Sequence, residues 1–530
     1  MKNKKIFIFI LTLAAILRFY KLGDIPLSLD WDENSNAYNA YSILKTGRDE
    51  YGALFPLTNK SFDDYKPPMY MYLNVPAVAI FGLTPLAARL PSAIFGFLTV
   101  PAFYFLARRL FRDIDLKIQI ASLHLDIPTL AMLLLAISPW HLQFSRVGFE
   151  ATVGLFFAVT SITTFLYALE RPRLLVVSAI LLGLSSYTYH TQRIFVPLLF
   201  IASFIIWKSD VLKLSKKTLF IFVTTTVLIG LPLVIFIPPK VILQRFEATT
   251  GRPKLEDIEK SIKFIHEDNN SKLSKYIHNR RVVIGQTYIS NYLSHFDMNF
   301  LFTKGDDNMR HHIDNMGMLY IFELPLLILA SYRLLKDKRK EFIFILIWLI
   351  IAPIAATPAT PNPHGNRSLP MIIAFELISA YGLILLANSK TNFRKIIIYG
   401  FTFWIVLSFF VYLNNYWKHY PYDMASFWQF GYKEAAQETI KHKDEFNKIY
   451  VNGLEQAYIF WLFNTKYDPK AYQLSGSRDH FDKFYFDTKP EDPDSLLVAP
   501  ADAFPRDFKI IKIINYPDGT PVIKVGFKEK

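Results

Sequence analysis

The sequence predicts a polytopic α-helical membrane protein with about eleven transmembrane helices and a small C-terminal α/β domain. Of its 530 residues 52% are hydrophobic and 16% aromatic. The apolar residues form long runs, such as 130–137 and 342–354, without the polar face of an amphipathic soluble helix. Buried helices of a soluble protein are the alternative, and the absence of polar faces argues against them. Beyond residue 414 the apolar runs shorten to the length of strands.

Each long apolar run predicts one transmembrane helix, although some must extend into their flanks to reach the roughly 20 residues that a span requires. The expected helices lie near 6–22, 87–109, 125–142, 148–169, 174–189, 193–208, 218–237, 317–334, 341–356, 370–388 and 395–414. The further run 69–82 is short and contains Pro76. If it crossed the bilayer, all later basic clusters would change sides, so we expect a helix in the outer interface.

Basic clusters set the orientation, because lysine and arginine favour the cytoplasmic side of a membrane. With eleven crossings they all fall on one side: Lys2/Lys4/Lys5, Arg108/Arg109/Arg112, Arg171/Arg173, Lys208/Lys213/Lys216/Lys217, Lys336/Lys338/Arg339/Lys340 and Lys390/Arg394/Lys395. No small-residue cleavage site follows the first apolar run, which predicts an uncleaved first helix. We therefore expect a multi-pass plasma-membrane protein with a cytoplasmic N-terminus.

Three regions then face outward: the loop 23–86, the segment 238–315, and the chain after residue 414. The predicted domains are a transmembrane catalytic domain, 1–414, and an extracytoplasmic α/β domain, 415–530. Apolar stretches at 448–451, 496–498 and 508–514 are the expected strands of the second domain. Surface helices are expected within 238–315.

Composition excludes several classes of chemistry. The chain has no cysteine, which excludes disulfides, thiolate nucleophiles and cysteine-bound zinc. Its net charge of +14 comes from the short clusters between apolar runs, so an anionic lipid surface is the expected partner and nucleic acid is not.

The first outward loop carries the strongest chemical signal. It contains Asp30-Trp31-Asp32-Glu33 and, further on, Asp63-Asp64-Tyr65-Lys66-Pro67-Pro68. A carboxylate at the bilayer edge can accept the proton of a hydroxyl while a lysine holds a lipid phosphate. Alternatively, Asp32 is the N-cap of a helix over 34–44, and Lys66 belongs to a stiff turn that anchors to head groups.

Polar outward turns add several cations at the same depth. They are 138–150 with Arg146, 187–193 with His190 and Arg193, and 361–367 with Arg367. A single arginine at a helix end is most simply an interfacial anchor. Together with Lys66, however, these arginines predict a site for a phosphate or pyrophosphate head group.

These motifs, with Ala87-Ala88-Arg89-Leu90-Pro91-Ser92-Ala93, the turn Ser138-Pro139-Trp140-His141 and the helix start at Arg367-Ser368-Leu369-Pro370, resemble the GT-C membrane glycosyltransferases. The likeness is to the protein O-mannosyltransferase and aminoarabinose transferase type, glycosyltransferase family 39. It implies a polyprenyl-phosphate sugar donor, a hydroxyl acceptor (protein, glycolipid or cell-wall glycan) and transfer at the outer face. It also implies catalysis by Asp32 and Glu33 and a phosphate contact for Lys66. Tyr65 separates Asp64 from Lys66, where many relatives have Asp-Lys directly, which leaves the role of Asp64 open.

The predicted function is therefore an inverting hexosyl- or pentosyltransferase of the cell envelope. Catalysis is assigned to Asp32 and Glu33, donor phosphate binding to Lys66, Arg146, Arg193, Arg310 and Arg367, and acceptor or sugar binding to Asp64, Tyr65 and His190. A lipid-linked sugar flippase is the alternative, which the absence of repeated halves disfavours; a non-catalytic scaffold is a weaker one. No fixed spacing predicts metal ligands, so no metal site is assigned and a divalent cation near the acidic residues or His311-His312 stays open.

Overall fold

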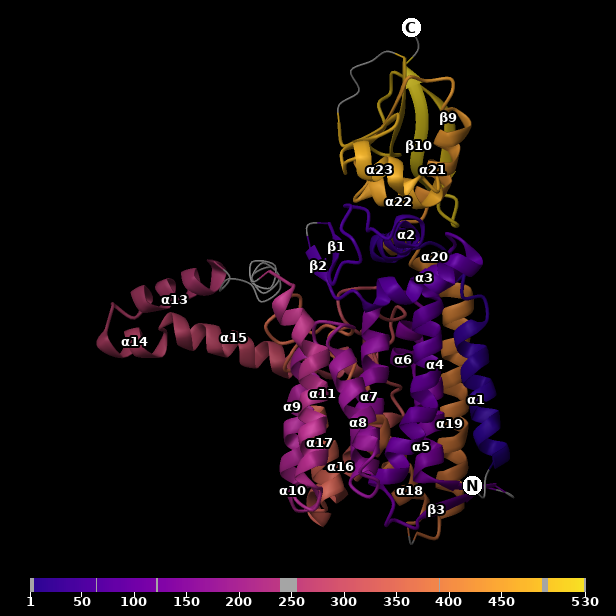
Figure 1. Cartoon of the computed structure of the whole chain (residues 1–530). Coiled ribbons are helices and arrows are strands. Elements are labelled where there is room, and N and C mark those ends of the chain that lie inside the picture. Colours follow the sequence, from indigo (N-terminus) through magenta and orange to yellow (C-terminus); the bar gives the residue numbers. More distant parts are fainter. Residues whose placement is uncertain are drawn as a thin grey trace. The chain divides into compact units, whose positions relative to one another are not determined.

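A computed structural model describes residues 4–62, 64–120, 123–238, 255–389, 391–488 and 494–528 (Figure 1). The chain divides into two compact units. The first, here called the helical unit, comprises Met1–Leu17, Phe95–Phe144 and Ala151–Phe410. The second, the mixed unit, comprises Arg18–Ile94, Ser145–Glu150 and Val411–Lys530. The mixed unit joins the first outward loop to the C-terminal part of the chain. The predicted domain division at residue 414 stays a prediction.

Each of the eleven expected apolar helices corresponds to helical structure. The helices are α1 (Lys4–Phe19), α4 (Pro85–Leu110), α5 (Ile127–Ile137), α6 (Pro139–Ser145), α7 (Glu150–Ala168), α8 (Leu174–Ser185), α9 (Gln192–Ile206), α11 (Lys216–Ile235), α16 (Glu323–Asp337), α17 (Lys340–Ile351), α18 (Met371–Ala387) and α19 (Arg394–Asn414). Among the described residues, four helices are long and apolar enough to cross a membrane, or five if α5 and α6 form one bent span. The count of eleven crossings stays a prediction.

The helix expected over 125–142 is broken at Ser138, where α5 and α6 meet at an angle of 56°. Pro139 lacks an N–H group and disfavours helical backbone in the residue before it. Ser138 accordingly has ψ 127°.

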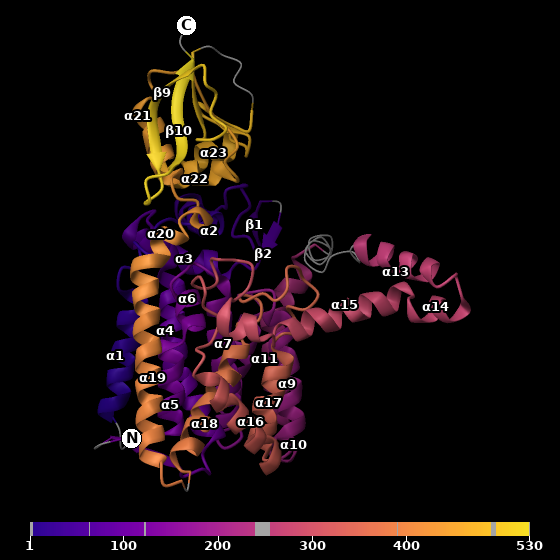
Figure 2. The ribbon, with the colours of Figure 1, turned by 180° about the vertical axis from the view of Figure 1, so that it is seen from behind.

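Packing within the helical unit follows the apolar faces. Figure 2 shows α16 beside α18, and α18 also packs on α5. Residues of α1, α4 and α5 share a smaller buried cluster that includes Ile10, Val100 and Met132. The other elements of this unit are β3 (Lys117–Ile120), β4 (Leu123–Asp126), α10 (Lys208–Val211), α13 (Leu255–Glu267), α14 (Lys272–Ile277), α15 (Arg280–Ser294) and the π-helix η1 (Asn299–Thr303). Helices are thus present in the segment 238–315, of which 239–254 lies outside the described residues.

The mixed unit contains a six-stranded sheet with the order β6-β7-β5-β8-β10-β9. Its strands are β5 (Lys448–Val451), β6 (His480–Phe481), β7 (Phe484–Phe486), β8 (Ser495–Pro500), β9 (Phe508–Asn515) and β10 (Pro521–Lys528). β5 runs parallel to β7 and β8, and the other neighbours are antiparallel. Three strands match the expected apolar stretches, whereas β6 and β7 are very short and β10 alternates apolar and polar residues, so no continuous apolar run marks them.

Around this sheet lie α21 (Tyr432–Lys441), α22 (Ala457–Asn464) and α23 (Pro469–Ser475), which follow η2 (Asn415–His419), α20 (Tyr420–Asp423) and η3 (Ser426–Trp428). The first loop supplies α2 (Trp31–Thr46), β1 (Asn59–Ser61), β2 (Asp64–Lys66) and α3 (Met69–Phe81). α2 packs against α3, α22 and α23 (Figure 1). One buried cluster therefore extends from Tyr38 and Val78 to Trp461 and Val498.

The structure defines the start of the first helix in the loop and the extent of the apolar run 69–82. The N-cap alternative for Asp32 is wrong, because α2 begins at Trp31 and its N-cap is Asp30, whose carboxylate accepts the Glu33 N–H at 2.8 Å. The helix expected over 34–44 is correspondingly longer. The run 69–82 forms the 13-residue α3, which starts after Pro68 and is shorter than a membrane span.

Candidate functional site

Asp32 and Lys66, both assigned to the predicted site, are neighbours in the structure. The Lys66 ammonium donates to the Asp32 carboxylate in an ion pair. Asp32 lies in the first turn of α2, and Lys66 is the last residue of β2, opposite Asn59 of β1. One third of the Asp32 side chain and 13% of the Lys66 side chain are exposed, so a ligand can reach the carboxylate.

A second carboxylate, that of Glu150, belongs to the same group. Asn36 of α2 donates to Glu150 Oε1 at 3.2 Å and accepts from Asn59 Nδ2 at 2.8 Å. Burial opposes the charge on Lys66, but the fields of Asp32 and Glu150 outweigh it and raise the Lys66 pKa above its usual value. Lys66 is therefore held as an ammonium among carboxylates.

Glu33 is fully buried and its carboxylate is already occupied. Oε1 accepts from Arg89 Nε at 2.9 Å and from the Gly148 N–H at 2.8 Å, and Oε2 accepts from the Asp30 N–H at 3.1 Å. Arg89 also donates to the carbonyls of Leu22, Pro26 and Ser28. This geometry fits a structural role for Glu33 better than proton transfer, and it fixes the loop that precedes Asp32.

Sequence reasoning gave no role to Arg89 or Gly148. Arg89 belongs to the Ala-Arg-Leu-Pro motif, and a buried arginine in an apolar helix start signals a carboxylate partner. Gly148 permits a close approach, because a Cβ atom there would lie 2.9 Å from Glu33 Cγ and 3.2 Å from the Tyr70 hydroxyl.

Arg146, predicted to bind the donor phosphate, is buried in the mixed unit. Its Nε donates to the Tyr416 hydroxyl at 2.9 Å and its Nη1 to the Arg18 carbonyl at 3.2 Å. Its guanidinium lies 4.4 Å from the centre of the Trp417 ring. A phosphate would have to displace these contacts, and the predicted role stays a prediction.

The roles predicted for the remaining site residues stay predictions. Asp64 and Tyr65 lie in β2, where Asp64 Oδ1 accepts from the Tyr65 N–H at 2.8 Å. The other four belong to the helical unit. Arg193 donates to Ser186 O at 2.9 Å, Arg310 to Asn308 Oδ1 at 3.3 Å and Arg367 to Thr360 O at 3.1 Å, and the ring of His190 lies 6.5 Å from that of Tyr189.

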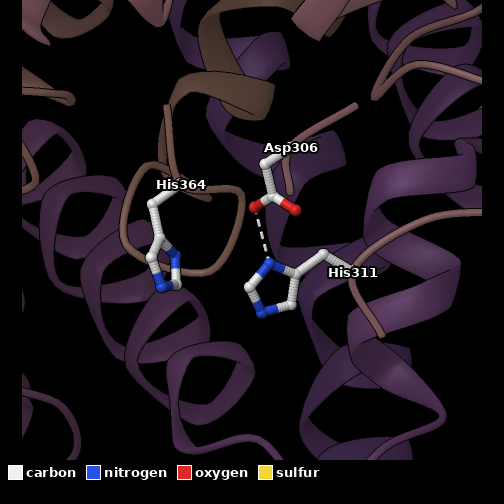
Figure 3. A group of neighbouring side chains, drawn as sticks. All are labelled: Asp306, His311 and His364. Carbon is white, nitrogen blue, oxygen red and sulfur yellow. Dashed lines mark hydrogen bonds and ion pairs between the residues drawn. The ribbon is translucent and has the colours of Figure 1, made fainter. Parts of the chain in front are cut away.

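A group of metal-ligand residues lies in the helical unit. Donor atoms of Asp306, His311 and His364 all lie within 4.8 Å of one another, and Figure 3 shows the two rings and the carboxylate turned toward a common space. His311 Nδ1 is 2.6 Å from Asp306 Oδ2, and within the described part of the chain the buried His364 Nδ1 has no hydrogen-bond partner. Although burial would raise it, interaction with His311 holds the Asp306 pKa at about 2. Two imidazoles and a carboxylate form a donor set that suits zinc.

The polytopic helical architecture resembles that of membrane glycosyltransferases of the GT-C type. Residues 65–236 match the family model described as dolichyl-phosphate-mannose-protein mannosyltransferase, which confirms the resemblance seen in the motifs. A search of curated protein sequences gave no match.

Two solved structures of ArnT from Cupriavidus metallidurans carry the structural likeness. The form bound to undecaprenyl phosphate has a TM-score of 0.57 and the apo form 0.55, each at 12% identity and over 99% of this chain and 98% of that chain. At this identity the likeness establishes the fold. The oligosaccharyltransferase of Archaeoglobus fulgidus in complex with Zn and sulfate is 16% identical over 87% of this chain, with a TM-score of 0.49, and the chain spans 61% of its length.

Proposed function

We propose that this protein is a glycosyltransferase that moves a sugar from a polyprenyl-phosphate donor to a hydroxyl acceptor with inversion. The observation that carries the proposal is the accessible Asp32 carboxylate paired with Lys66 in the first loop. The family match and the fold shared with a transferase bound to undecaprenyl phosphate support the donor class. A hexose or a pentose fits the proposal equally.

In the proposed reaction the acceptor oxygen attacks the anomeric carbon as Asp32 accepts the hydroxyl proton. The bond between that carbon and the phosphate oxygen breaks, and its electron pair stays on the phosphate. Lys66 stabilises the phosphate as its charge grows, which lowers the barrier because the interaction strengthens in the transition state.

The ion pair between Asp32 and Lys66 also links donor binding to catalysis. When the donor phosphate binds, the Lys66 ammonium interacts with the phosphate, and its interaction with the Asp32 carboxylate becomes weaker. The carboxylate is then released as a base only when donor is present. Glu33 acts as a positioning residue, since its contacts with Arg89 and Gly148 hold the start of α2.

The proposed orientation follows the basic clusters, with the N-terminus in the cytoplasm and the first loop and C-terminal sheet outside the plasma membrane. A polyprenyl-phosphate sugar presented in the outer leaflet would then be on the same side of the membrane as Lys66. Protein, glycolipid and cell-wall glycan are the proposed classes of acceptor.

Two measurements test the proposal on the full-length protein in detergent. Mass spectrometry of co-purified lipid is expected to find a polyprenyl phosphate or its glycoside. Release of polyprenyl phosphate from synthetic donors, with envelope extract as acceptor, is expected to fall about a hundredfold or more in Asp32→Asn and Lys66→Ala. Lys470→Ala, an exposed lysine of the same unit, is the control and should match the parent. Parental turnover in both site variants would refute the assignment.

A further inference from the structure

The mixed unit contains a polar cavity of about 790 Å³ that the proposed transfer step does not use. Three lining residues, Glu50, Tyr51 and Lys60, come from the first loop. The others come from the C-terminal part of the chain, between 455 and 487. Because α2 packs on α22 and α23, the first loop and the C-terminal part of the mixed unit form the cavity together.

Glu50, one of the residues that line the cavity, carries a buried oxygen whose hydrogen bonding is unsatisfied. Its side chain is buried, with 2% of the residue exposed, and its Oε1 accepts from Asn39 Nδ2 at 3.1 Å. Its Oε2 has no hydrogen-bond partner among the residues that the structure describes. A buried carboxyl oxygen without a partner costs free energy, and Glu50 lines the cavity, so a hydrogen-bond donor on a bound ligand would lower that cost.

The charged groups of the cavity are of both signs and are partly paired with aromatic rings. The Lys60 ammonium lies 4.4 Å from the centre of the Tyr51 ring, and the Arg478 guanidinium 5.6 Å from that of Tyr458. The hydroxyls of Tyr51 and Tyr458 are 3.5 Å apart. Carboxylates of Asp479 and Asp487 line the same space. A strongly anionic ligand would meet these carboxylates, and an acyl chain would leave the polar groups unpaired.

A neutral saccharide avoids repulsion from the carboxylates and also satisfies the polar groups. Its hydroxyls both donate and accept hydrogen bonds, and the faces of its rings pack on tyrosine. A peptide suits the cavity less well, since apolar side chains would displace water from polar walls without replacing its hydrogen bonds.

The short ribbon β1–β2 connects this cavity to the candidate site. Asn59 contacts Asn36, and Ser61 contacts Ser35, so both side chains of β1 point to α2. Because side chains alternate along a strand, Lys60 points to the opposite face, where it lines the cavity. Lys66 lies opposite Asn59 in the same ribbon. The cavity and the Asp32–Lys66 pair thus share one structural element.

We infer that this cavity is a saccharide-binding subsite that holds the glycan portion of the acceptor. The assignment to the acceptor rests on the proposed function, whereas saccharide binding itself does not. Removing the Glu50 carboxyl or the Arg478 guanidinium should therefore weaken the binding of a neutral oligosaccharide without disturbing the donor site.

The test titrates the full-length protein with mannotriose, chitotriose and a neutral tripeptide, followed by saturation-transfer NMR and calorimetry. At least one trisaccharide should bind saturably. Glu50→Leu and Arg478→Met should each raise its dissociation constant at least tenfold. Glu50→Gln, which keeps a hydrogen-bonding group in the same volume, should retain binding. Asp444→Asn, an exposed acid of the same unit, is the control. Thermal unfolding verifies that each variant is folded; if Glu50→Leu is not, Arg478→Met decides.

Asp32→Asn separates this inference from the proposed function. If it loses transfer and keeps trisaccharide binding, both stand. If it transfers like the parent while the cavity variants lose binding, the transferase mechanism fails and the subsite stands. Absence of trisaccharide binding, equal binding in the cavity variants, or tripeptide binding in place of saccharide overturns the inference.

Discussion

Replacing Arg89 by methionine tests the buried ion pair that positions α2. Methionine keeps most of the apolar stem but removes the donors to Glu33 and to the carbonyls of Leu22, Pro26 and Ser28. Both partners of the pair have side chains with no exposed surface. Removing one leaves the Glu33 carboxylate buried without its counter-charge, which costs about 3–5 kcal/mol.

The expected shift in melting temperature follows from this cost. One kcal/mol moves the Tm of a cooperative unit of about 200 residues, roughly the size of the mixed unit, by about 2–4 °C. Arg89→Met should therefore lower the Tm by roughly 6–20 °C in differential scanning fluorimetry of the purified protein.

Arg112, which lies shortly after Arg89 in the chain but in the helical unit, provides a control with an exposed ion pair. It pairs with Glu170, but 58% and 49% of the two side chains are exposed. An exposed pair contributes about 0–1 kcal/mol, so Arg112→Met should leave the Tm within a few degrees. If Arg89→Met and Arg112→Met gave equal shifts, the argument that this pair holds the site would be wrong.

Three further predictions concern other parts of the chain. Gly148→Ala should lower stability by about 1–3 kcal/mol and reduce transfer, because its Cβ would lie 2.9 Å from Glu33 Cγ; an unchanged Tm would contradict the close approach. Burial raises the Glu50 pKa to about 8 from 4.5, so its contribution to stability is complete below pH 4.5 and decreases by up to about 1.4 kcal/mol per unit up to pH 8. In unfolding measured from pH 5 to 8, the parent should lose stability relative to Glu50→Gln, and parallel profiles would contradict this. Elemental analysis should find about one equivalent of a divalent metal in the purified parent and less in His364→Ala, whereas no metal in either would exclude a resident ion bound with Asp306 and His311.

Much of the fold follows from sequence because the physical signal is local. Long apolar runs produced helices at every expected place, since backbone groups in an apolar surrounding must pair within the segment. The break at Ser138 also has a local cause, because Pro139 disfavours helical backbone in the residue before it. This break was not predicted, because the apolar run 125–142 has the length of a single transmembrane helix. The start of α2 was missed by three residues, as several acids there can each serve as a cap and only the backbone decides which one does.

The sequence by itself determined the class of protein and the chemical inventory of the first loop, because hydropathy, charge clusters and motifs are properties of short segments. The tertiary structure decided which acid is accessible. Asp32 and Glu33 are adjacent in the chain, but helical geometry turns one toward Lys66 and the other into contact with Arg89 and Gly148. It also decided that the first loop and the C-terminal sheet share a core and a cavity, since no local pattern encodes contacts between residues some 400 positions apart.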